Sequence, residues 1–349
     1  MREVSINGKM IGKRNPCFVI AEAGVNHNGN FESAIRLIEI AVDAGADAVK
    51  FQTFIAEQVV SPIAPKAKYQ EAAMTNGESQ LEMVKKLELP FEAFTKLNEY
   101  CKRNNILFLS TPFDHKSADF LQELNIKAIK VASGEITNLP FLSHLAKKNI
   151  PLIISTGMAT LGEIETALGI VESAGNNEYI LLHCVSNYPA APEDANLRAM
   201  DTLRAAFDVP VGFSDHTLGI EIPIAAVALG ANIIEKHFTL DQHLPGPDHR
   251  SSLEPEELRS MITGIRKVEI ALGNGIKRPS NNELEIAKVA RKSLIIAKDL
   301  KQGTILTKNM IVIQRPGTGL SPSMLDFVVG RRLIKDVKMG SLLLMDLIE

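Results

Sequence analysis

Eight short apolar segments recur along roughly the first 240 residues, and a longer segment with helical spacing of its apolar residues follows most of them. They occupy residues 18–22, 48–52, 106–111, 128–133, 152–156, 179–184, 209–214 and 232–238. Strands that alternate with helices in this way pair in parallel. Eight such units in about 250 residues match a closed (β/α)8 barrel better than an open sheet, so we predict an α/β fold of this kind.

The last part of the chain has a different pattern, because one motif occurs in it twice. Ala297-Lys-Asp-Leu-Lys-Gln-Gly303 is echoed by Ile334-Lys-Asp-Val-Lys-Met-Gly340, and an apolar run follows each glycine. A glycine in this place suits a turn with positive φ before a strand. We predict a barrel domain at residues 1–275, a polar linker at 276–290, and a small, mostly β domain at 291–349. Residues 55–78 are predicted to form a long loop over the mouth of the barrel.

Composition excludes several classes of protein. The chain has 349 residues with 38 basic and 41 acidic side chains, a net charge of −3, and no long run of Lys or Arg. A general nucleic-acid binder needs a basic face to neutralise phosphates, so we expect no nucleic-acid partner. Three scattered cysteines without a CxxC motif favour reduced thiols and a cytoplasmic location. The apolar segments are too short or too interrupted for a signal peptide or a membrane span, so we expect no membrane partner.

Every predicted barrel strand ends in polar side chains. Catalytic groups of parallel barrels lie at the carboxyl ends of the strands, so these side chains would meet at one mouth. Polar residues from all eight strands favour an active site over a purely structural barrel. In strand order the candidates are Glu22, then Lys50 and Gln52, Thr111, then Lys130, Ser133 and Glu135, then Ser155, Thr156 and Gly157, then Tyr188, then Ser214 and His216, and finally His237.

Two lysines point to an anionic substrate. Lys50 and Lys130 interrupt apolar runs, where a strongly hydrated ammonium group is costly to bury unless an anion accompanies it. Ser133, Ser155 and Gly157 add hydroxyl and backbone N–H donors for such an anion. The alternative is that each lysine forms a buried ion pair with a glutamate on a neighbouring strand. A barrel-strand lysine with a lowered pKa would also suit a Schiff-base aldolase.

Two histidines point to a metal ion. His216 and His237 fall at the ends of the last two predicted strands, which are neighbours in a closed barrel. Two imidazoles so placed can bind a divalent ion and leave positions for water and substrate. With few other protein ligands, such a site favours Mn2+ or Zn2+, and the sequence does not choose between them. The alternative is a hydrogen-bonded core histidine at each position.

Several motifs occupy the predicted strand ends and the tail. They include Ala21-Glu-Ala-Gly-Val-Asn-His-Asn-Gly29, Phe213-Ser-Asp-His-Thr217 and the segments at residues 49–53, 110–114, 130–135, 155–158, 235–239, 245–248 and 314–319. In this order and spacing they resemble the sialic acid synthase family over nearly the whole chain. The last segment resembles that family's antifreeze-like (SAF) domain. A sugar-binding protein without catalysis is the alternative from another class.

The resemblance implies a reaction in which phosphoenolpyruvate condenses with an N-acetylated mannose-type sugar in its open-chain form and phosphate is released. It assigns phosphoenolpyruvate to Lys50, Thr111, Lys130, Ser133, Ser155 and Ser214, with a divalent ion at His216 and His237. This ion is expected to be Mn2+, with Mg2+ or Co2+ as alternatives. Glu22 would assist the water and the sugar hydroxyls. Gln52, Tyr188 and Asp248 would contact the sugar, and Arg315 would reach it from the other subunit of a homodimer with swapped C-terminal domains.

The resemblance defines the acceptor sugar less closely. The family makes N-acetylneuraminate, legionaminate and pseudaminate, and residues 64–70 and 78–83 resemble the first two branches. We expect an N-acetylneuraminate synthase that uses N-acetylmannosamine. A legionaminate synthase that uses 2,4-diacetamido-2,4,6-trideoxymannose is the alternative. Ser186 stands where some neuraminate synthases have Asn, and this difference bears on recognition of the N-acyl group.

Overall fold

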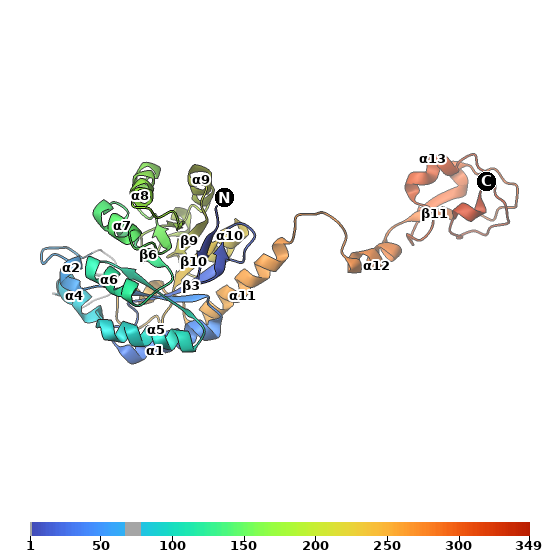
Figure 1. The fold of residues 1–349 in the computed structure, drawn as a ribbon. Helices are drawn as coiled ribbons and strands as arrows, with labels where there is room; N and C mark the ends of the chain where they lie inside the picture. Colours follow the sequence, from blue (N-terminus) through green and yellow to red (C-terminus); the bar gives the residue numbers. More distant parts are fainter. Residues whose placement is uncertain (1, 67–77) are drawn as a thin grey trace. The chain divides into compact units, whose positions relative to one another are not determined.

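A computed structural model describes residues 2–66 and 78–349 of the chain. It contains two compact units, Met1–Gly273 and Asn274–Glu349, which are described separately (Figure 1). The first unit is a closed barrel with strand order β10-β3-β4-β5-β6-β7-β8-β9, and every neighbouring pair is parallel. The predicted (β/α)8 barrel is therefore confirmed.

The barrel strands agree closely with the predicted segments. They are β3 (Phe18–Gly24), β4 (Ala48–Thr53), β5 (Leu107–Pro112), β6 (Ile129–Val131), β7 (Leu152–Ser155), β8 (Tyr179–Cys184), β9 (Val211–Asp215) and β10 (Ile233–His237). The strand β6 is shorter than predicted, because the chain turns into a 3-10 helix at Ser133–Glu135 shortly after it.

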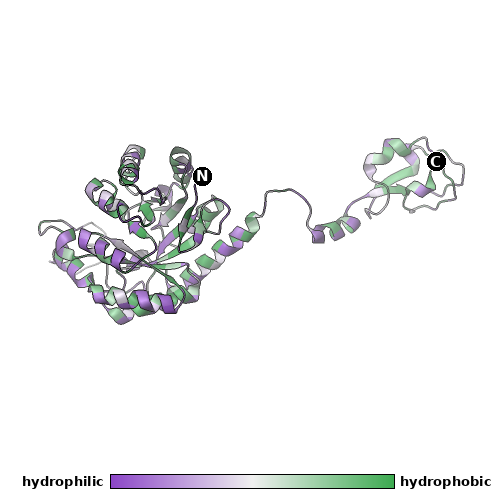
Figure 2. Cartoon of the chain, viewed as in Figure 1, coloured by the Kyte–Doolittle hydropathy of each residue, from purple (hydrophilic) through white to green (hydrophobic). Residues whose placement is uncertain are grey.

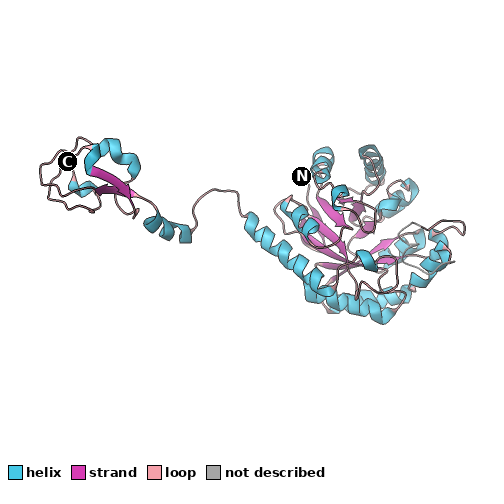
Figure 3. Ribbon diagram, turned by 180° about the vertical axis from the view of Figure 1, so that it is seen from behind, coloured by secondary structure: helices cyan, strands magenta, loops and turns pink. Residues whose placement is uncertain are grey.

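Helices surround the barrel, as Figure 3 shows. The main ones are α1 (Phe31–Ala44), α5 (Phe91–Arg103), α6 (His115–Glu123), α7 (Leu139–Ala146), α8 (Leu161–Ser173), α9 (Ala199–Phe207), α10 (Glu221–Ala228) and α11 (Pro255–Leu272). Side chains that accept backbone N–H bonds define several of the first turns: Asn30 caps α1, Asp114 caps α6, and Thr160 forms a capping box with Glu163 on α8.

The described part of the segment predicted as a loop over the barrel mouth, residues 55–78, contains the short helix α2 (Ala56–Val59), and the helix α4 (Gln80–Leu87) begins just after the segment. Residues 67–77 of this segment, and with them part of the motif at 64–70, lie outside the described residues. A feature that the pattern did not predict is a hairpin of β1 (Val4–Ile6) and β2 (Lys9–Ile11). It packs on the apolar inner layer of the barrel together with Phe18 and Ile20.

Two apolar layers build the barrel core. One lies between the strands and the helices, and the other fills the lumen at the amino ends of the strands, with Phe18, Ile20, Leu109 and Ile153 among its members. Strand residues are mainly hydrophobic in Figure 2, whereas the helices alternate in character. Side chains on a strand alternate between its two faces. The inner face therefore passes from Ile20 to Glu22 within one strand, and the polar layer begins above the apolar one.

The second unit has its own small core, which includes Leu294, Leu306, Val328 and Leu343. Its elements are α12 (Asn281–Ala290), the antiparallel pair β11 (Ser293–Ile296) and β12 (Ile311–Gln314), and α13 (Leu325–Val328). The helix α12 falls in the predicted linker. The two copies of the repeated motif pair through the bridge between Leu300 and Val337.

Both glycines of the repeat have the expected positive φ, 84° at Gly303 and 83° at Gly340. The small, mostly β domain is confirmed. In the parts of the chain that the structure describes, no helix has the length and apolar character needed to cross a membrane.

Candidate active site

A cavity of about 420 Å³ opens at the carboxyl ends of the barrel strands. It exists because inward-facing positions at these ends carry polar or small side chains, while the lumen below them is filled by apolar ones. Most of the predicted site residues line it: Glu22, Lys50, Gln52, Thr111, Lys130, Ser133, Ser155, Tyr188, Ser214, His216, His237 and Asp248.

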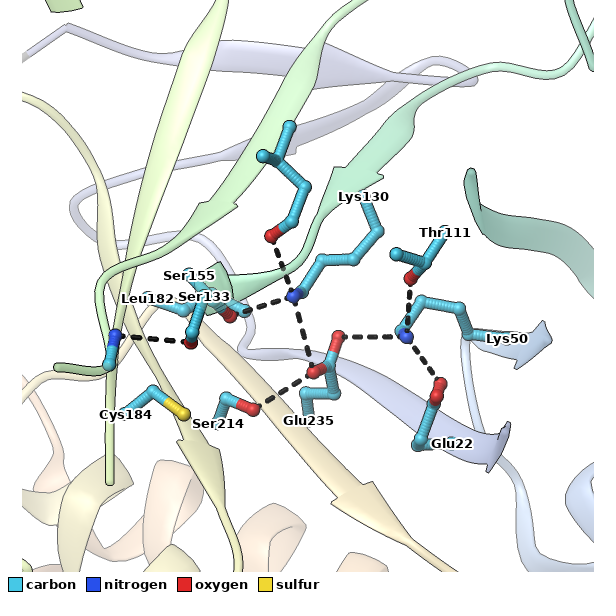
Figure 4. A network of polar contacts seen from close by, with 12 residues as sticks. Glu22, Lys50, Thr111, Lys130, Ser133, Ser155, Leu182, Cys184, Ser214 and Glu235 are labelled. Atoms are coloured by element: carbon cyan, nitrogen blue, oxygen red, sulfur yellow. Dashed lines mark hydrogen bonds and ion pairs between the residues drawn. The ribbon is translucent and has the colours of Figure 1, made fainter. Parts of the chain in front are cut away.

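Two lysines and two glutamates form a buried network on the floor of this cavity (Figure 4). Lys50 Nζ lies 2.6 Å from Glu22 Oε2 and 3.7 Å from Glu235 Oε2. Lys130 Nζ lies 3.6 Å from Glu235 Oε1. The Lys50–Glu22 contact is the neighbouring-strand ion pair that the sequence left open as an alternative. Glu235 instead links two lysines whose strands, β4 and β6, are not its neighbours.

Hydroxyl groups complete the network. Lys50 donates to Thr111 Oγ1 at 2.9 Å, and Lys130 donates to Ser155 Oγ at 2.7 Å. The Ser214 hydroxyl donates to Glu235 Oε1 at 2.9 Å. Each of these residues also lines the cavity, so its hydroxyl group can rotate toward a bound anion.

Burial and neighbouring charges shift the protonation of this floor. Burial raises the pKa of Glu22 to about 7, although Lys50 opposes the rise. Burial would also raise the pKa of Glu235, but Lys130 and Lys50 outweigh it and hold that pKa below its usual value. With Glu22 protonated, two ammonium groups face one carboxylate, and the floor carries a net positive charge. Protonation of a single carboxyl therefore changes the network from balanced to net positive charge.

The two histidines lie together at the edge of the cavity. Their ring centroids are 5.5 Å apart, and the Tyr188 ring is 4.0 Å from that of His216. His216 Nδ1 donates to the carbonyl of Val185 at 2.7 Å, which leaves Nε2 as the nitrogen able to bind a metal. His237 Nδ1 is buried without a hydrogen-bond partner, 3.9 Å from Asp248 Oδ2. Burial, together with the positive groups nearby, lowers the pKa of His237 well below its usual value.

The donor set fits a metal site with two protein ligands. A neutral imidazole is the form that coordinates a cation, and the lowered pKa of His237 favours that form. Its Nδ1 atom is buried without a hydrogen-bond partner, so it is free to bind a metal ion. Among the described residues, no group of three or more His, Cys, Asp or Glu side chains converges as a metal site.

Gly24 lets the two parts of the site approach each other. A Cβ atom at this position would lie 3.3 Å from Gln52 Nε2, Glu22 Oε1 and His237 Cε1, and the backbone φ is +52°. Both the close approach and the left-handed backbone favour glycine. No sequence pattern assigned a role to this glycine.

A second layer of hydrogen bonds holds the loop that carries Asp248. Asn26 Nδ2 donates to the Phe238 carbonyl at 2.8 Å and to Ser252 Oγ at 2.9 Å. Ser252 in turn donates to the Asp248 carbonyl at 2.7 Å. Burial raises the pKa of Asp248 to about 6. These bonds fix the loop that follows β10 against the loop that follows β3.

A few predicted residues do not line the cavity. Glu135 ends the 3-10 helix and accepts a bond from Asn138, while the Thr156 hydroxyl donates to the Leu182 carbonyl. Gly157 donates its N–H to Ser133 Oγ, and a side chain there would collide with Ser133 and Ser186. Arg315 belongs to the second unit, where its Nε donates to the Ala290 carbonyl at 3.1 Å.

Other cavity residues were not assigned a role from the sequence. Glu235 is the most important, and its signal was present, because it lies two positions before His237 and so shares the inner face of β10. Cys184 lies 3.8 Å from His216 Nδ1, a contact that depends on β8 and β9 being neighbours. The remaining ones include the apolar Val25, Phe54, Val59, Val60, Met83, Val84, Leu87 and Phe113 and the polar Gln80 and Ser186.

The fold and this site define the class of protein. A parallel barrel with convergent lysines, carboxylates and imidazoles at its mouth is built as an enzyme for a small anionic substrate. Comparison with known proteins then identifies the family: residues 37–277 match the NeuB family and residues 291–349 match the SAF domain. The chain belongs to the NeuB family.

Its relatives are similar over nearly their whole length. The chain is 48% identical to the N,N'-diacetyllegionaminic acid synthase of Legionella pneumophila, covering 99% of this chain and 98% of the relative. It is 50% identical to that of Campylobacter jejuni, covering 93% and 98%. A crystal structure of N-acetylneuraminic acid synthetase from Leptospira borgpetersenii has 39% identity and a TM-score of 0.71, covering 82% of this chain and 95% of that one. The predicted family and enzyme class, a phosphoenolpyruvate-condensing transferase, are confirmed.

Proposed function

We propose that this enzyme condenses phosphoenolpyruvate with open-chain 2,4-diacetamido-2,4,6-trideoxymannose to give a legionaminate-type nine-carbon 2-keto acid and phosphate. The single observation that carries the general reaction is the buried floor of Lys50, Lys130, Glu22 and Glu235 beside two histidines. The acceptor is chosen because relatives at 48% and 50% identity are named N,N'-diacetyllegionaminic acid synthases. N-acetylmannosamine, the acceptor expected from the motifs, is the competing candidate.

The floor suits both charged ends of phosphoenolpyruvate. Its carboxylate and phosphate would accept from Lys50 and Lys130, and Thr111, Ser133, Ser155 and Ser214 would donate their hydroxyls. Anion binding favours the protonated form of Glu22, because a neutral carboxyl does not repel the anion. The pKa of about 7 places this protonation near neutrality. The lysines would therefore exchange part of their contact with carboxylates for contact with the substrate.

The reaction has a balanced course at this floor. C3 of phosphoenolpyruvate forms a bond to the aldehyde carbon of the sugar, and the aldehyde oxygen takes up a proton. Water adds to C2, which has become cationic, and phosphate leaves from C2 to give the 2-keto acid. Glu22 lines the cavity, and its pKa of about 7 would allow it to exchange a proton with the water near neutrality. Lys50 and Lys130 would stabilise the departing phosphate.

A divalent ion, expected to be Mn2+, would be held by His216 Nε2 and His237 Nδ1. When bound, it would polarise the aldehyde as a Lewis acid. Asp248 and Gln52 lie beside these histidines in the cavity and would orient the sugar hydroxyls. Mg2+ and Co2+ are the alternative ions. The cytoplasmic location of the protein also stays a prediction.

A substrate panel tests the proposed function directly. The enzyme with Mn2+ and phosphoenolpyruvate is supplied with either candidate acceptor, and phosphate release and the 2-keto acid product are measured. We expect turnover with both sugars and a higher kcat/KM for the diacetamido sugar. A borohydride-trapped lysine adduct without phosphate release would instead support the Schiff-base aldolase, and binding without turnover would support a sugar-binding protein.

Replacing the histidines tests the metal assignment. His216→Ala and His237→Ala should each abolish turnover and weaken Mn2+ binding by at least tenfold, because each removes half of the protein ligands. Electron paramagnetic resonance titration of free Mn2+ measures the binding, and circular dichroism verifies the fold. Normal turnover of the double variant in a thoroughly chelated sample would reject these ligands.

We also propose that two chains form a two-fold homodimer in which Arg315 of one chain completes the site of the other. The support is the family resemblance and an exposed guanidinium suited to forked hydrogen bonds with sugar oxygens or a carboxylate. Mixing inactive Arg315→Ala and His237→Ala chains should restore some activity, because one site of each mixed dimer would be intact. Absence of recovery after verified subunit exchange would place the arginine's action within its own chain or remove it from catalysis.

A further inference from the structure

The cavity has two unlike sides above its charged floor. One side is apolar and is built by residues that follow β3, β4 and β5 or belong to α2 and α4. Its apolar members are Val25, Phe54, Val59, Val60, Met83, Val84, Leu87 and Phe113, here called the apolar wall, and Gln80 of α4 is a polar side chain that lines the cavity beside them. The opposite side carries Ser186 and Tyr188, which follow β8. In the closed strand order, β4 and β8 stand opposite each other, so the two sides face across the mouth.

The apolar wall is a packed structure of its own. Val25, Phe54 and Leu87 are buried together, with Val84 and Phe113 packed against them. The rings of Phe54 and Phe113 meet edge to face, with centroids 6.3 Å apart. Such a cluster holds its shape without a ligand, and it offers carbon rather than hydrogen-bonding groups to whatever lies against it.

Strand alternation places this wall one layer above the floor. On β4, Lys50 and Gln52 both face the cavity, and Phe54 follows at the next inward position. On β5, Thr111 is followed in the same way by Phe113. A sugar whose aldehyde lies near His237 and Gln52 therefore has the wall within reach of its distal carbons.

We propose that the apolar wall receives the distal end of the acceptor and selects a 6-deoxy methyl group over a hydroxymethyl group. This inference rests on the proposed function and adds the residues that choose the sugar. Transfer of a methyl group from water to this surface lowers the free energy of binding. A hydroxyl placed there loses its hydrogen bonds to water and finds no replacement among these carbon side chains. The wall thus favours a 6-deoxy acceptor, such as the diacetamido sugar, over N-acetylmannosamine.

A pair of substrates that differ in one oxygen atom isolates this effect. N-acetylmannosamine and its 6-deoxy analogue are compared with the Mn2+-loaded enzyme, and kcat/KM is measured from phosphate release. The wild-type enzyme should prefer the 6-deoxy sugar by about tenfold or more, which is the discrimination typical of one small group in an apolar pocket. In Val84→Thr, which keeps the shape but adds a hydroxyl, this preference should fall severalfold while the KM for phosphoenolpyruvate stays unchanged.

Matched variants separate this role from a general loss of stability. Val268→Thr makes the same change at a half-buried position on α11, outside the cavity, and should leave the sugar preference unchanged. Val59→Thr repeats the test at an exposed wall position, where folding is least at risk. Equal kcat/KM for the two sugars in the wild type, or an unchanged ratio in both wall variants, would overturn the inference alone. Absence of phosphate release with every sugar would overturn the proposed function, and the inference with it.

Discussion

Lysine–carboxylate pairs on the floor of the barrel cavity and in the repeat of the C-terminal unit lie in opposite surroundings. In the barrel, Lys50 and Glu22 are almost completely buried, with side chains 3% and 2% exposed. In the C-terminal unit, Lys301 pairs with Asp336 and Lys338 with Asp299, and these side chains are 58–86% exposed. The same chemical pair therefore serves two purposes. A buried charge must keep its partner, whereas an exposed charge is solvated with or without one.

The exposed pairs follow the internal repeat. Asp299 and Lys301 belong to the first copy of the motif, and Asp336 and Lys338 belong to the second. Each aspartate bonds the lysine of the other copy, at 2.7 Å and 2.8 Å, on either side of the bridge between Leu300 and Val337. The apolar residues between the charges, and the two glycine turns, hold this arrangement. In the barrel the relation is reversed, since the charges themselves are enclosed.

The largest effect is expected when a buried partner is removed. Lys50→Met should abolish phosphate release or greatly raise the KM for phosphoenolpyruvate, because it removes a substrate contact. It should also destabilise the fold by about 3–5 kcal/mol, since it leaves buried carboxylates with less compensation. Urea denaturation and steady-state kinetics measure the two effects. The double variant Lys50→Met, Glu22→Gln should recover stability but not activity. Wild-type kinetics in the single variant Lys50→Met would instead show that the lysine is only a structural ion-pair partner.

A pH titration tests a second consequence of burial. All eight histidines lie in the barrel unit. Burial lowers the pKa of His27 to about 4, below the ordinary 6.5 that the unfolded chain retains. Between these values the unfolded state binds a proton that the folded state does not, so stability should fall as the pH decreases from about 6.5 to about 4. The slope from this residue is at most ~1.4 kcal/mol per pH unit.

His27→Asn isolates that contribution, because its side-chain oxygen can still accept the Gly29 N–H that His27 Nδ1 accepts at 3.0 Å. The variant should lose stability less steeply below pH 6.5 in urea titrations at several pH values. His243→Asn, at an exposed position, provides the control and should retain the wild-type slope. An identical slope in the His27 variant and the wild type would show that another group is responsible.

The smallest effect is expected at the exposed pairs. Lys301→Met and Lys338→Met should leave the unfolding midpoint and the activity unchanged within error, because water solvates the aspartate that each leaves behind. Differential scanning calorimetry at low and high salt provides the measurement. A loss of stability similar to that of Lys50→Met would mean that the two units use their ion pairs in the same way.

Much of the barrel could be predicted from the sequence, because strand alternation and helix spacing are local properties. The carboxyl ends of the strands were therefore known approximately, and Lys50, Lys130, His216 and His237 were placed at one mouth. Two predicted site residues are exceptions. The 3-10 turn after β6 carries Glu135 away from the cavity, and Thr156 bonds to the backbone of β8 instead.

Sequence by itself determined the order of the elements, the repeat with its two positive-φ glycines, and which residue types stand at each strand end. Only the tertiary structure decided which of these side chains meet. Glu235 reaches Lys130 across the lumen from a strand that does not pair with β6, and Val25, Phe54, Val84 and Phe113 form one wall although they are far apart in the chain. The physical reason is that periodicity records only which face of an element is buried, whereas the partner of a buried group depends on barrel closure and on side chains that many separate segments bring together.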